Sequence, residues 1–220
     1  MKRLLLFAAL CLSACASTQN SDDPFEARDP IKPVNEQIFA FNLVADKWVI
    51  KPVAGTYHLL PSWSRESIDN FLTNLGEPSN AVNGILQRDP KIAFTSFWRF
   101  ALNSTIGFAG LRDFAGENGL KDIDTDFGKT LGSYGVADGA YIVLPLAGPS
   151  TVRDATGIVV DWFFDPIGWF MTTPETIAQI AMDGISTRDS NAAIINQLYY
   201  ESLEPYSATR SAYLQHKAFK

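Results

Sequence analysis

The chain has 220 residues, of which 46% are hydrophobic, 12% aromatic and 19% charged. This composition excludes a disordered polyelectrolyte and a coiled coil, and the length allows one domain or at most two. With 18 basic against 24 acidic residues the net charge is -6. This balance argues against nucleic acid as a partner, because binding DNA or RNA requires a basic surface.

The first residues are typical of a secretory signal peptide. Lys2 and Arg3 precede a short apolar run over 4–12, which is too brief to span a bilayer. The run leads into Leu12-Ser13-Ala14-Cys15, which resembles the bacterial lipobox, the motif whose cysteine is lipidated and becomes the first mature residue. We therefore expect a lipoprotein signal peptide over 1–14 and a covalent lipid on Cys15. An ordinary signal peptide, with a cysteine there by chance, is the alternative.

Lipidation of Cys15 has consequences for the mature chain. Cys11 leaves with the signal peptide, so no cysteine remains for a disulfide or a metal site. An anchor of two or more acyl chains holds a protein on a membrane almost permanently. Ala16 and Ser17 follow, without the aspartate associated with inner-membrane retention, so the lipobox resemblance implies the outer membrane. The polar residues 15–28 predict a flexible tether.

Apolar residues at helical spacing predict two helices in the first part of the body. The first begins near Asn35 and is expected to stop at Pro52. The second is capped by Ser62 or Ser64, and Gly76 and Pro78 are expected to end it.

A short helix over 82–86 comes next, and Asp89-Pro90 then supplies an N-cap and first-turn proline for a helix over 91–105. This helix is apolar nearly all round, with only Lys91 and Arg99 charged. Such a helix lies either in the core or against lipid. Its candidates for a membrane-facing belt are Phe94, Phe97 and Trp98.

The middle of the chain is rich in glycine: ten of the fifteen glycines lie between Gly107 and Gly157. Gly128, Gly132, Gly135 and Gly139 are spaced three to four apart around Tyr134 and Tyr141. On a helix this spacing makes a stripe that permits close approach, and in a loop it makes a flexible hairpin. The sequence alone does not choose. Residues 141–146 have strand character, but Pro145 and the lack of a second strand make a sheet an unfavoured prediction.

Residues 158–171 combine aromatic rings with isolated carboxylates, as in an element that lies at a membrane interface. Asp161, Asp165, Pro166 and Gly168 interrupt the run too often for it to span a bilayer. A buried helix of a soluble domain explains this segment alone equally well, and the lipid anchor favours the membrane. The belt candidates here are Trp162, Phe163, Phe164, Trp169 and Phe170.

Three helices are predicted after this segment. One begins at Thr173-Pro174, a second is capped by Asp189, and the last begins at Pro205.

Catalytic and metal-binding motifs are weak. His58 and His216 have no second ligand or base at a recognised spacing, so we expect no metal site and no catalytic triad. The acidic turn of Asp122, Asp124 and Asp126 imitates the opening of a calcium loop, but a solvated turn explains it more simply.

A series of short segments in chain order resembles the MlaA (VacJ) family of outer-membrane lipoproteins. They are Phe41-Asn42, Lys51-Pro52-Val53-Ala54, Asn70-Phe71-Leu72-Thr73-Asn74-Leu75 with Glu77-Pro78, Val82-Asn83 with Leu86-Gln87, Arg99-Phe100 with Asn103-Ser104-Thr105 and Gly107, Asp126-Phe127-Gly128 with Thr130-Leu131-Gly132 and Tyr134-Gly135-Val136, Leu144-Pro145 with Gly148-Pro149, Arg153-Asp154 with Gly157, and Pro205-Tyr206 with Arg210 and Tyr213-Leu214. One departure is Arg88-Asp89, where the family pattern predicts a glycine.

The resemblance implies an all-α fold: a ring-shaped (doughnut) arrangement of amphipathic helices around a central pore, with a Gly-rich hairpin segment, as a single domain over 29–220. It further implies a position in the inner leaflet of the outer membrane, on its periplasmic face and beside a trimeric porin. Its activity would be to pass mislocalised phospholipids from the outer leaflet to a periplasmic lipid carrier, which maintains outer-membrane lipid asymmetry. The candidates for the pore or hairpin are Asn42, Gly128, Gly132, Tyr134, Gly135, Gly139 and Tyr141.

Elementary energetics favour a passive conduit. Pulling a two-chain phospholipid into water exposes about thirty methylenes, at a cost on the order of 25 kcal/mol, so a passage must shield the tails. We expect no cofactor other than the covalent lipid on Cys15, and no catalysis. Two alternatives remain: a structural lipoprotein that only scaffolds porins, and a periplasmic lipid hydrolase that uses Asp161 and Asp165 with His58 or His216.

Overall fold

The computed structural model describes residues 28–218. The helices are α2 (Lys32–Ala45), η3 (Asp46–Ile50, a π-helical turn), α3 (Lys51–His58), α4 (Ser62–Leu86), α5 (Pro90–Thr105), α6 (Phe114–Glu117), α7 (Phe127–Ser133), α8 (Val152–Phe164), α9 (Thr173–Ser190), α10 (Ala192–Asn196), η4 (Gln197–Glu201, also π-helical) and α11 (Pro205–Ala218), and the strands are β1 (Tyr141–Leu144) and β2 (Gly148–Thr151). The signal peptide, Cys15 and nearly all of the tether lie outside the described residues.

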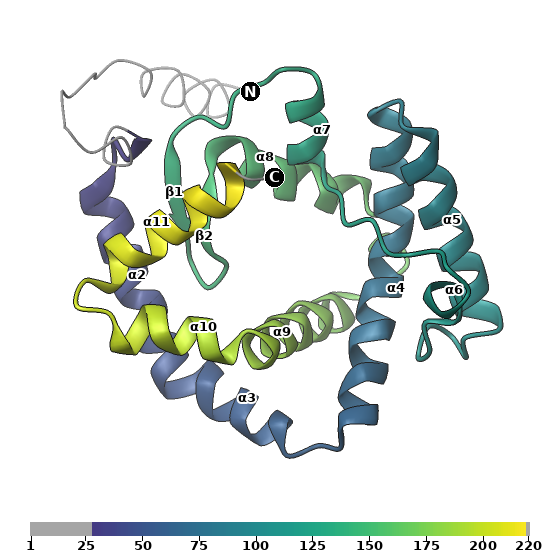
Figure 1. The fold of residues 1–220 in the computed structure, drawn as a ribbon, viewed down its shortest axis with the longest axis horizontal. Coiled ribbons are helices and arrows are strands. Elements are labelled where there is room, and N and C mark those ends of the chain that lie inside the picture. The colour runs from purple at the N-terminus through teal and green to yellow at the C-terminus, as the bar shows by residue number, and fades with distance from the viewer. Residues whose placement is uncertain (1–27, 219–220) are drawn as a thin grey trace.

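The helices follow one another around a ring. In Figure 1, α2 and α3 form the left and lower sides, α4 the right side and α8 the upper side, while α5 and α6 lie outside α4. No backbone crosses the middle of the ring in this view. The predicted ring of helices is confirmed. Within residues 28–218, no helix combines the length and apolar character needed to cross a bilayer.

The first helical stretch does not stop at Pro52, as the sequence predicted. Helix α2 continues through η3 into α3, and Pro52 lies in the first turn of α3. A proline has no N–H to give to the preceding turn. Just before it the backbone N–H of Lys51 bonds to the carbonyl of Asp46, so the helix is widened where the proline must fit.

Helix α4 is a second correction, because it runs through Gly76 and Pro78 instead of ending there. The second predicted helix and the short helix over 82–86 are therefore one element, and it begins after Pro61 rather than at a serine cap. Helix α4 packs against α5, and such packing overrides the local preference of one glycine and one proline.

Helix α4 ends in a left-handed turn at Arg88, whose φ is 59°. The N–H of Asp89 bonds to the carbonyl of Gly84 (2.9 Å), and that of Arg88 bonds to the carbonyl of Ile85 (3.0 Å). This pair of bonds is the Schellman motif, whose left-handed position favours glycine. Asp89 then caps α5 as predicted, because its side chain accepts from the N–H groups of Lys91 and Ile92.

A small antiparallel sheet is present although the sequence analysis did not favour one. Strand β1 pairs with β2, with Tyr141 opposite Thr151 and Leu144 opposite Gly148. Pro149 is tolerated because a two-stranded ribbon consists only of edges. The second strand escaped prediction because Gly148–Thr151 has little strand propensity of its own.

The later helices agree in part with the prediction. Helix α9 begins at Thr173 and α11 at Pro205, as expected. Asp189 does not cap a helix, since it lies inside the last turn of α9, and α10 begins only after Asn191.

The apolar core is small. It consists of Phe39, Tyr141, Val143, Tyr206 and Leu214, where α2, the hairpin and α11 meet. The rings of Phe39 and Tyr206 make an edge contact with centroids 5.6 Å apart. Among the described residues, buried polar and charged side chains outnumber buried hydrophobic ones. The ring is therefore held together largely by polar contacts.

Candidate functional site

Helix α5 is inside-out compared with a helix of a water-soluble protein. Its buried residues are polar: Thr95, Ser96, Arg99 and Asn103. Its exposed residues include the aromatic belt candidates Phe94, Phe97 and Trp98. In water this arrangement exposes apolar area at a cost of roughly 25 cal/mol per Å². Against lipid tails the same rings are favourably placed and the polar groups are sheltered.

The second group of belt candidates is exposed as well. Trp162, Phe163 and Phe164 lie on α8, and Trp169 and Phe170 lie in the turn that follows, with Phe170 87% exposed. The indole N–H of Trp169 bonds to the carbonyl of Phe163 (2.9 Å), so this ring does not depend on water for a partner. These aromatic side chains form an uncovered apolar surface of the kind that marks a membrane or partner interface.

The buried face of α5 is fixed to α4 by an ion pair. The guanidinium of Arg99 contacts the carboxylate of Glu77, and these side chains are 2% and 0% exposed. Arg99 also donates to the carbonyl of Leu120 (2.6 Å) and lies 3.2 Å from Asp113. Burial raises the pKa of Glu77, although contact with Arg99 opposes this rise. The pair joins α4, α5 and the 113–120 connection into one unit.

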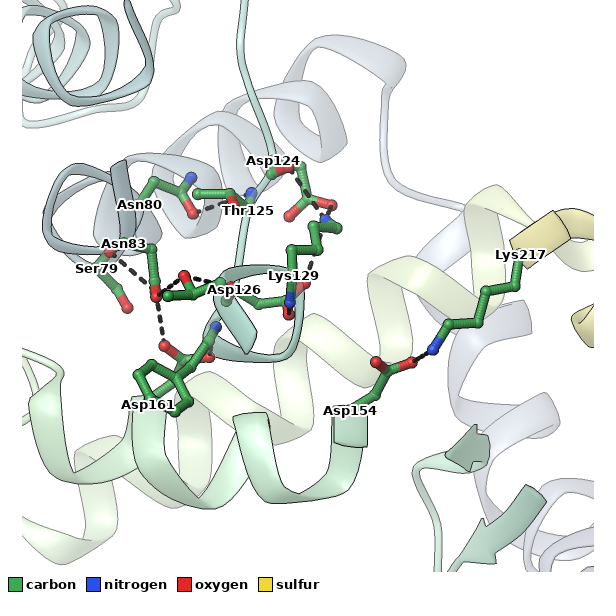
Figure 2. Close-up of polar contacts among 12 residues, drawn as sticks. Ser79, Asn80, Asn83, Asp124, Thr125, Asp126, Lys129, Asp154, Asp161 and Lys217 are labelled. Carbon is green, nitrogen blue, oxygen red and sulfur yellow. Dashed lines mark hydrogen bonds and ion pairs between the residues drawn. The ribbon is translucent and has the colours of Figure 1, made fainter. Parts of the chain in front are cut away.

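A second polar junction joins α4, α7 and α8 (Figure 2). Asp161 accepts from the side-chain amide of Asn83 (2.7 Å) and from the N–H of Phe127 (2.8 Å), while Asn83 accepts from the hydroxyl of Thr130 (2.8 Å). Burial raises the pKa of Asp161, and these two hydrogen bonds oppose that rise. With both oxygens accepting hydrogen bonds, the carboxylate of Asp161 connects three helices.

The glycine segment is part helix and part connection, and all four of its glycines precede the β1–β2 hairpin instead of forming it. Gly128 and Gly132 lie on helix α7, and Gly128 contacts Gly157 of α8 so closely that a Cβ on Gly157 would stand 2.4 Å from the nitrogen of Gly128. Gly135 and Gly139 lie in the connection to β1 with positive φ. Gly128 permits the close approach of α7 to α8, and Gly135 ends α7 in a left-handed turn.

Tyr134 and Tyr141 have opposite environments. Tyr134 is exposed, and its hydroxyl donates to the carbonyl of Leu86 (2.6 Å). Tyr141 belongs to the hairpin, but its ring is fully buried in the apolar core. The side chain of Tyr141 therefore supports the hairpin from within rather than facing a passage.

Two asparagines of α2 hold the hairpin. Asn35 donates to the carbonyl of Tyr141 (3.1 Å) and accepts from the N–H of Val143 (2.9 Å). Asn42 repeats this pattern with Leu144 (2.9 Å) and Leu146 (2.7 Å). The seven residues of helix from Asn35 to Asn42 span roughly 10 Å, and so do the three residues of strand from Tyr141 to Leu144. The two asparagine side chains therefore bond to the strand edge in the place of a neighbouring strand. Asn35 was not among the predicted site residues, although two asparagines two helical turns apart indicate a shared role.

The family model for the MlaA lipoprotein matches residues 27–220. The chain belongs to the MlaA lipoprotein family. A relative in Escherichia coli (strain K12), named "Intermembrane phospholipid transport system lipoprotein MlaA", is 35% identical over 98% of this chain and 86% of its own length. The protein of the same name in Haemophilus influenzae is 33% identical over 98% of this chain and 88% of its own length.

A solved structure described as the "Structural basis for maintenance of bacterial outer membrane lipid asymmetry" has the same ring-like fold as this MlaA-family chain. The two agree with a TM-score of 0.76 and 35% sequence identity, over 87% of this chain and 98% of the other. The fold and the family are thereby established together.

The carboxylates of the acidic turn lie close to other groups of this MlaA-family chain. Asp126 caps α7 by accepting from the N–H of Lys129 (2.7 Å), and Asp124 pairs with the ammonium of Lys129 (2.8 Å, Figure 2). Asp122 lies 4.0 Å from the guanidinium of Arg99. In the part of the chain that the structure describes, no group of three or more His, Cys, Asp or Glu could hold a metal ion.

The residues of the hydrolase alternative serve structural contacts. His58 lies 2.7 Å from Asp189, which also pairs with Arg65 (2.6 Å) across the corner between α3, α4 and α9. Asp165 accepts from the N–H of Ile167 in the turn after α8. Neither histidine is hydrogen-bonded to Asp161 or Asp165, so this MlaA-family chain does not form a carboxylate–histidine pair there.

Proposed function

We propose that this chain is an outer-membrane lipoprotein that removes mislocalised phospholipids from the outer leaflet and hands them to a periplasmic lipid carrier for retrograde transport. The observation that carries the proposal is the ring of helices (Figure 1) with inverted burial, in which many aromatic side chains are exposed and polar side chains are buried. Such a body is suited to lie within one leaflet and to enclose a polar route through it. The names of the family relatives agree with this role.

The energetics require a passage rather than a reaction. A phospholipid that moves between leaflets must pass its headgroup through hydrocarbon or its tails through water, and the second costs on the order of 25 kcal/mol. A ring with apolar surroundings lets the headgroup cross while the tails remain shielded. We propose that the chain acts passively, breaks no bond, and that the acceptor sets the direction of transfer.

The site of action follows from the anchor. Lipidation of Cys15 and the tether over 15–28 hold the ring at the periplasmic face of the outer membrane, where its belt enters the inner leaflet. A trimeric porin is proposed as the neighbour of the belt, and a soluble phospholipid-carrier protein as the acceptor. The support for an acceptor is that the relatives belong to an intermembrane system, which requires lipids to cross an aqueous space.

The decisive experiment compares surface phospholipid in cells with and without the gene. A membrane-impermeant amine reagent measures phosphatidylethanolamine exposed on the outer leaflet. We expect deletion to raise the labelling, and the intact chain to restore it. We expect the Cys15→Ala variant to lose outer-membrane localisation and restore nothing.

The alternatives predict different results in the same experiment. A scaffold for porins predicts unchanged labelling after deletion. A lipid hydrolase predicts release of lysophospholipid by the purified protein, and its loss in Asp161→Asn. A soluble Cys15→Ala variant with full activity would contradict the proposal.

A further inference from the structure

The outer face of the α2–η3–α3 stretch is apolar but carries two lysines. Phe41, Val44 and Val49 are exposed along this face, and Trp48 is 71% exposed. Lys47 and Lys51 stand among them, four residues apart and both exposed. We call Lys47, Trp48 and Lys51, together with Tyr200 of η4, the lysine–aromatic cluster.

Charge is separated across this helix. Asp46, next to Lys47, is buried, and its carboxylate binds the guanidinium of Arg188 (2.7 and 3.2 Å). Lys47 and Lys51 are exposed and have no carboxylate partner among the described residues. A chain with a net charge of -6 therefore presents two uncompensated positive charges on an apolar surface.

Both lysines lie over aromatic rings. The ammonium of Lys47 is 5.6 Å from the ring centre of Trp48, and that of Lys51 is 4.1 Å from the ring centre of Tyr200. The hydroxyl of Tyr200 donates to Asp46 (2.6 Å), so this ring is a fixed platform. Rings hold a cation in place without neutralising it, and the ammonium groups keep their capacity to bind an anion.

The local backbone is unusual at the same place. Asp46 belongs to the π-helical turn η3 and Tyr200 to the π-helical turn η4, so their hydrogen bond joins the two π-helical turns found within residues 28–218. Such turns are rare, and they occur frequently at functional sites.

We propose that the lysine–aromatic cluster binds the headgroup phosphate of an anionic phospholipid in the leaflet around the ring. Lysines on an apolar face extend their ammonium groups to headgroup depth, where Trp and Tyr rings also settle. A lipid with net negative charge, such as phosphatidylglycerol, satisfies both lysines, whereas the ammonium of phosphatidylethanolamine competes with them. This inference rests on the membrane position proposed above and adds a headgroup preference to the outer surface.

The test uses the full-length lipoprotein in nanodiscs of phosphatidylethanolamine with one quarter phosphatidylglycerol. Native mass spectrometry after gentle release gives the ratio of the two lipids that stay bound. For Lys47→Gln/Lys51→Gln we expect the phosphatidylglycerol enrichment to fall on the order of tenfold, since each lysine contributes several-fold to binding of an anionic surface. Lys47→Arg/Lys51→Arg is expected to keep the enrichment.

The matched control is Lys91→Gln/Lys121→Gln, which removes the same charge from two other exposed lysines. An equal fall in this control would overturn the proposal, because it would show general electrostatic attraction. So would an unchanged ratio in the Lys47→Gln/Lys51→Gln protein. Displacement of the lipid by 10 mM inorganic phosphate would overturn it too, since the site would then take free anions.

Failure of this inference is separable from failure of the proposed function. Transfer of phosphatidylethanolamine to an acceptor vesicle is measured for the same proteins, and we expect it to remain in Lys47→Gln/Lys51→Gln. Transfer without enrichment rejects only the headgroup site, and absence of transfer in the intact chain rejects the function.

Discussion

The side-chain oxygen of Asn42 accepts a hydrogen bond of 2.7 Å from the backbone N–H of Leu146, 104 positions later in the chain. The same side chain donates to the carbonyl of Leu144, so one helical residue holds both the end of β1 and the turn. The turn has no third strand beside it among the described residues, and the asparagine takes that place. The stability of the hairpin tip therefore depends on α2.

Asn42→Ala is expected to loosen the tip without unfolding the ring. The change leaves the N–H of Leu146 without its partner, at a cost of about 1–2 kcal/mol. Hydrogen exchange at Leu146 is therefore expected to accelerate about tenfold, with exchange in α5 unchanged. Asn118→Ala, an exposed asparagine elsewhere, serves as the control. Equal exchange at Leu146 in both variants would contradict the role of Asn42.

Arg88→Gly is expected to stabilise the protein. Arg88 has a φ of 59°, where a side chain costs about 1 kcal/mol and glycine costs almost nothing. Arg88 is exposed and its side chain has no hydrogen bond or ion pair with the residues that the structure describes, so the change loses no polar contact. Thermal unfolding in detergent measures the shift, and Arg88→Ala, which keeps the strain, is the comparison. A lower melting temperature for the glycine variant would refute the explanation.

Gly157→Ala is expected to separate α7 from α8. The added carbon would stand 2.4 Å from the nitrogen of Gly128 and 2.8 Å from its Cα, and backbone atoms cannot swing away. Overpacking of this kind costs about 1–3 kcal/mol. Gly184→Ala is the matched control, since Gly184 also lies in a helix but has nothing within 4 Å of the new carbon. The control is expected to be neutral or slightly stabilising in the same unfolding measurement.

Arg99→Met is expected to cost about 3–5 kcal/mol, because Glu77 remains buried without its counter-charge. Replacing both residues, as Arg99→Met/Glu77→Leu, removes the unpaired charge and is expected to recover most of that loss. The free energy of unfolding in detergent, measured for the two single variants and the double variant, gives the coupling energy. Additive losses would show that the two residues act independently.

The pKa of Asp154 predicts that the stability of the fold depends on pH. Burial acts to raise its pKa, but contact with Lys217 and the hydrogen bond from Tyr213 (2.8 Å) outweigh burial and lower it. A lowered pKa in the folded state stabilises the fold above the ordinary aspartate value, and the gain disappears as pH falls through the lowered value. Asp154→Asn is therefore expected to be less stable by about 1 kcal/mol at pH 7.

The same difference is expected to shrink as the pH falls below the ordinary aspartate value, where Asp154 is protonated first in the unfolded chain and then, at its lowered pKa, in the folded protein. The unfolding midpoints of the intact protein and of Asp154→Asn, taken at several pH values, measure this difference in stability. A difference that grew with acidity would mean that another group controls the region.

Some features of this molecule were predictable because they are local. The Asp89-Pro90 start of α5, the start of α11 at Pro205 and the apolar character of the belt all follow from a few neighbouring residues. The prediction that helices end at Pro52 and Pro78 was wrong, because a π-helical turn accommodates Pro52 and because α4, which packs against α5, continues through Pro78. The strand partner of β1 was missed because Gly148–Thr151 has little strand propensity, and the asparagines that hold β1 and the turn, Asn35 and Asn42, lie about a hundred residues away.

The candidate site also combines features that could be predicted from the sequence with features that depend on tertiary contacts. The exposed aromatic rings at 158–171 were predicted as a belt only with the help of the lipid anchor, since the segment alone fitted a buried helix equally well. The burial of Arg99 could not be predicted, because its counter-charge Glu77 lies on another helix. The closeness of Gly128 and Gly157 is also a tertiary fact, although glycine at both positions permits it.

The inside-out polarity of α5 also bears on biogenesis. Between secretion and arrival at its membrane, the chain must travel through an aqueous compartment with Phe94, Phe97 and Trp98 uncovered. Exposed aromatic side chains in water favour association between copies of the chain. Such aggregation competes with transport of the chain to its membrane. We therefore expect the newly exported polypeptide to need an escort that hides this surface until hydrocarbon replaces it.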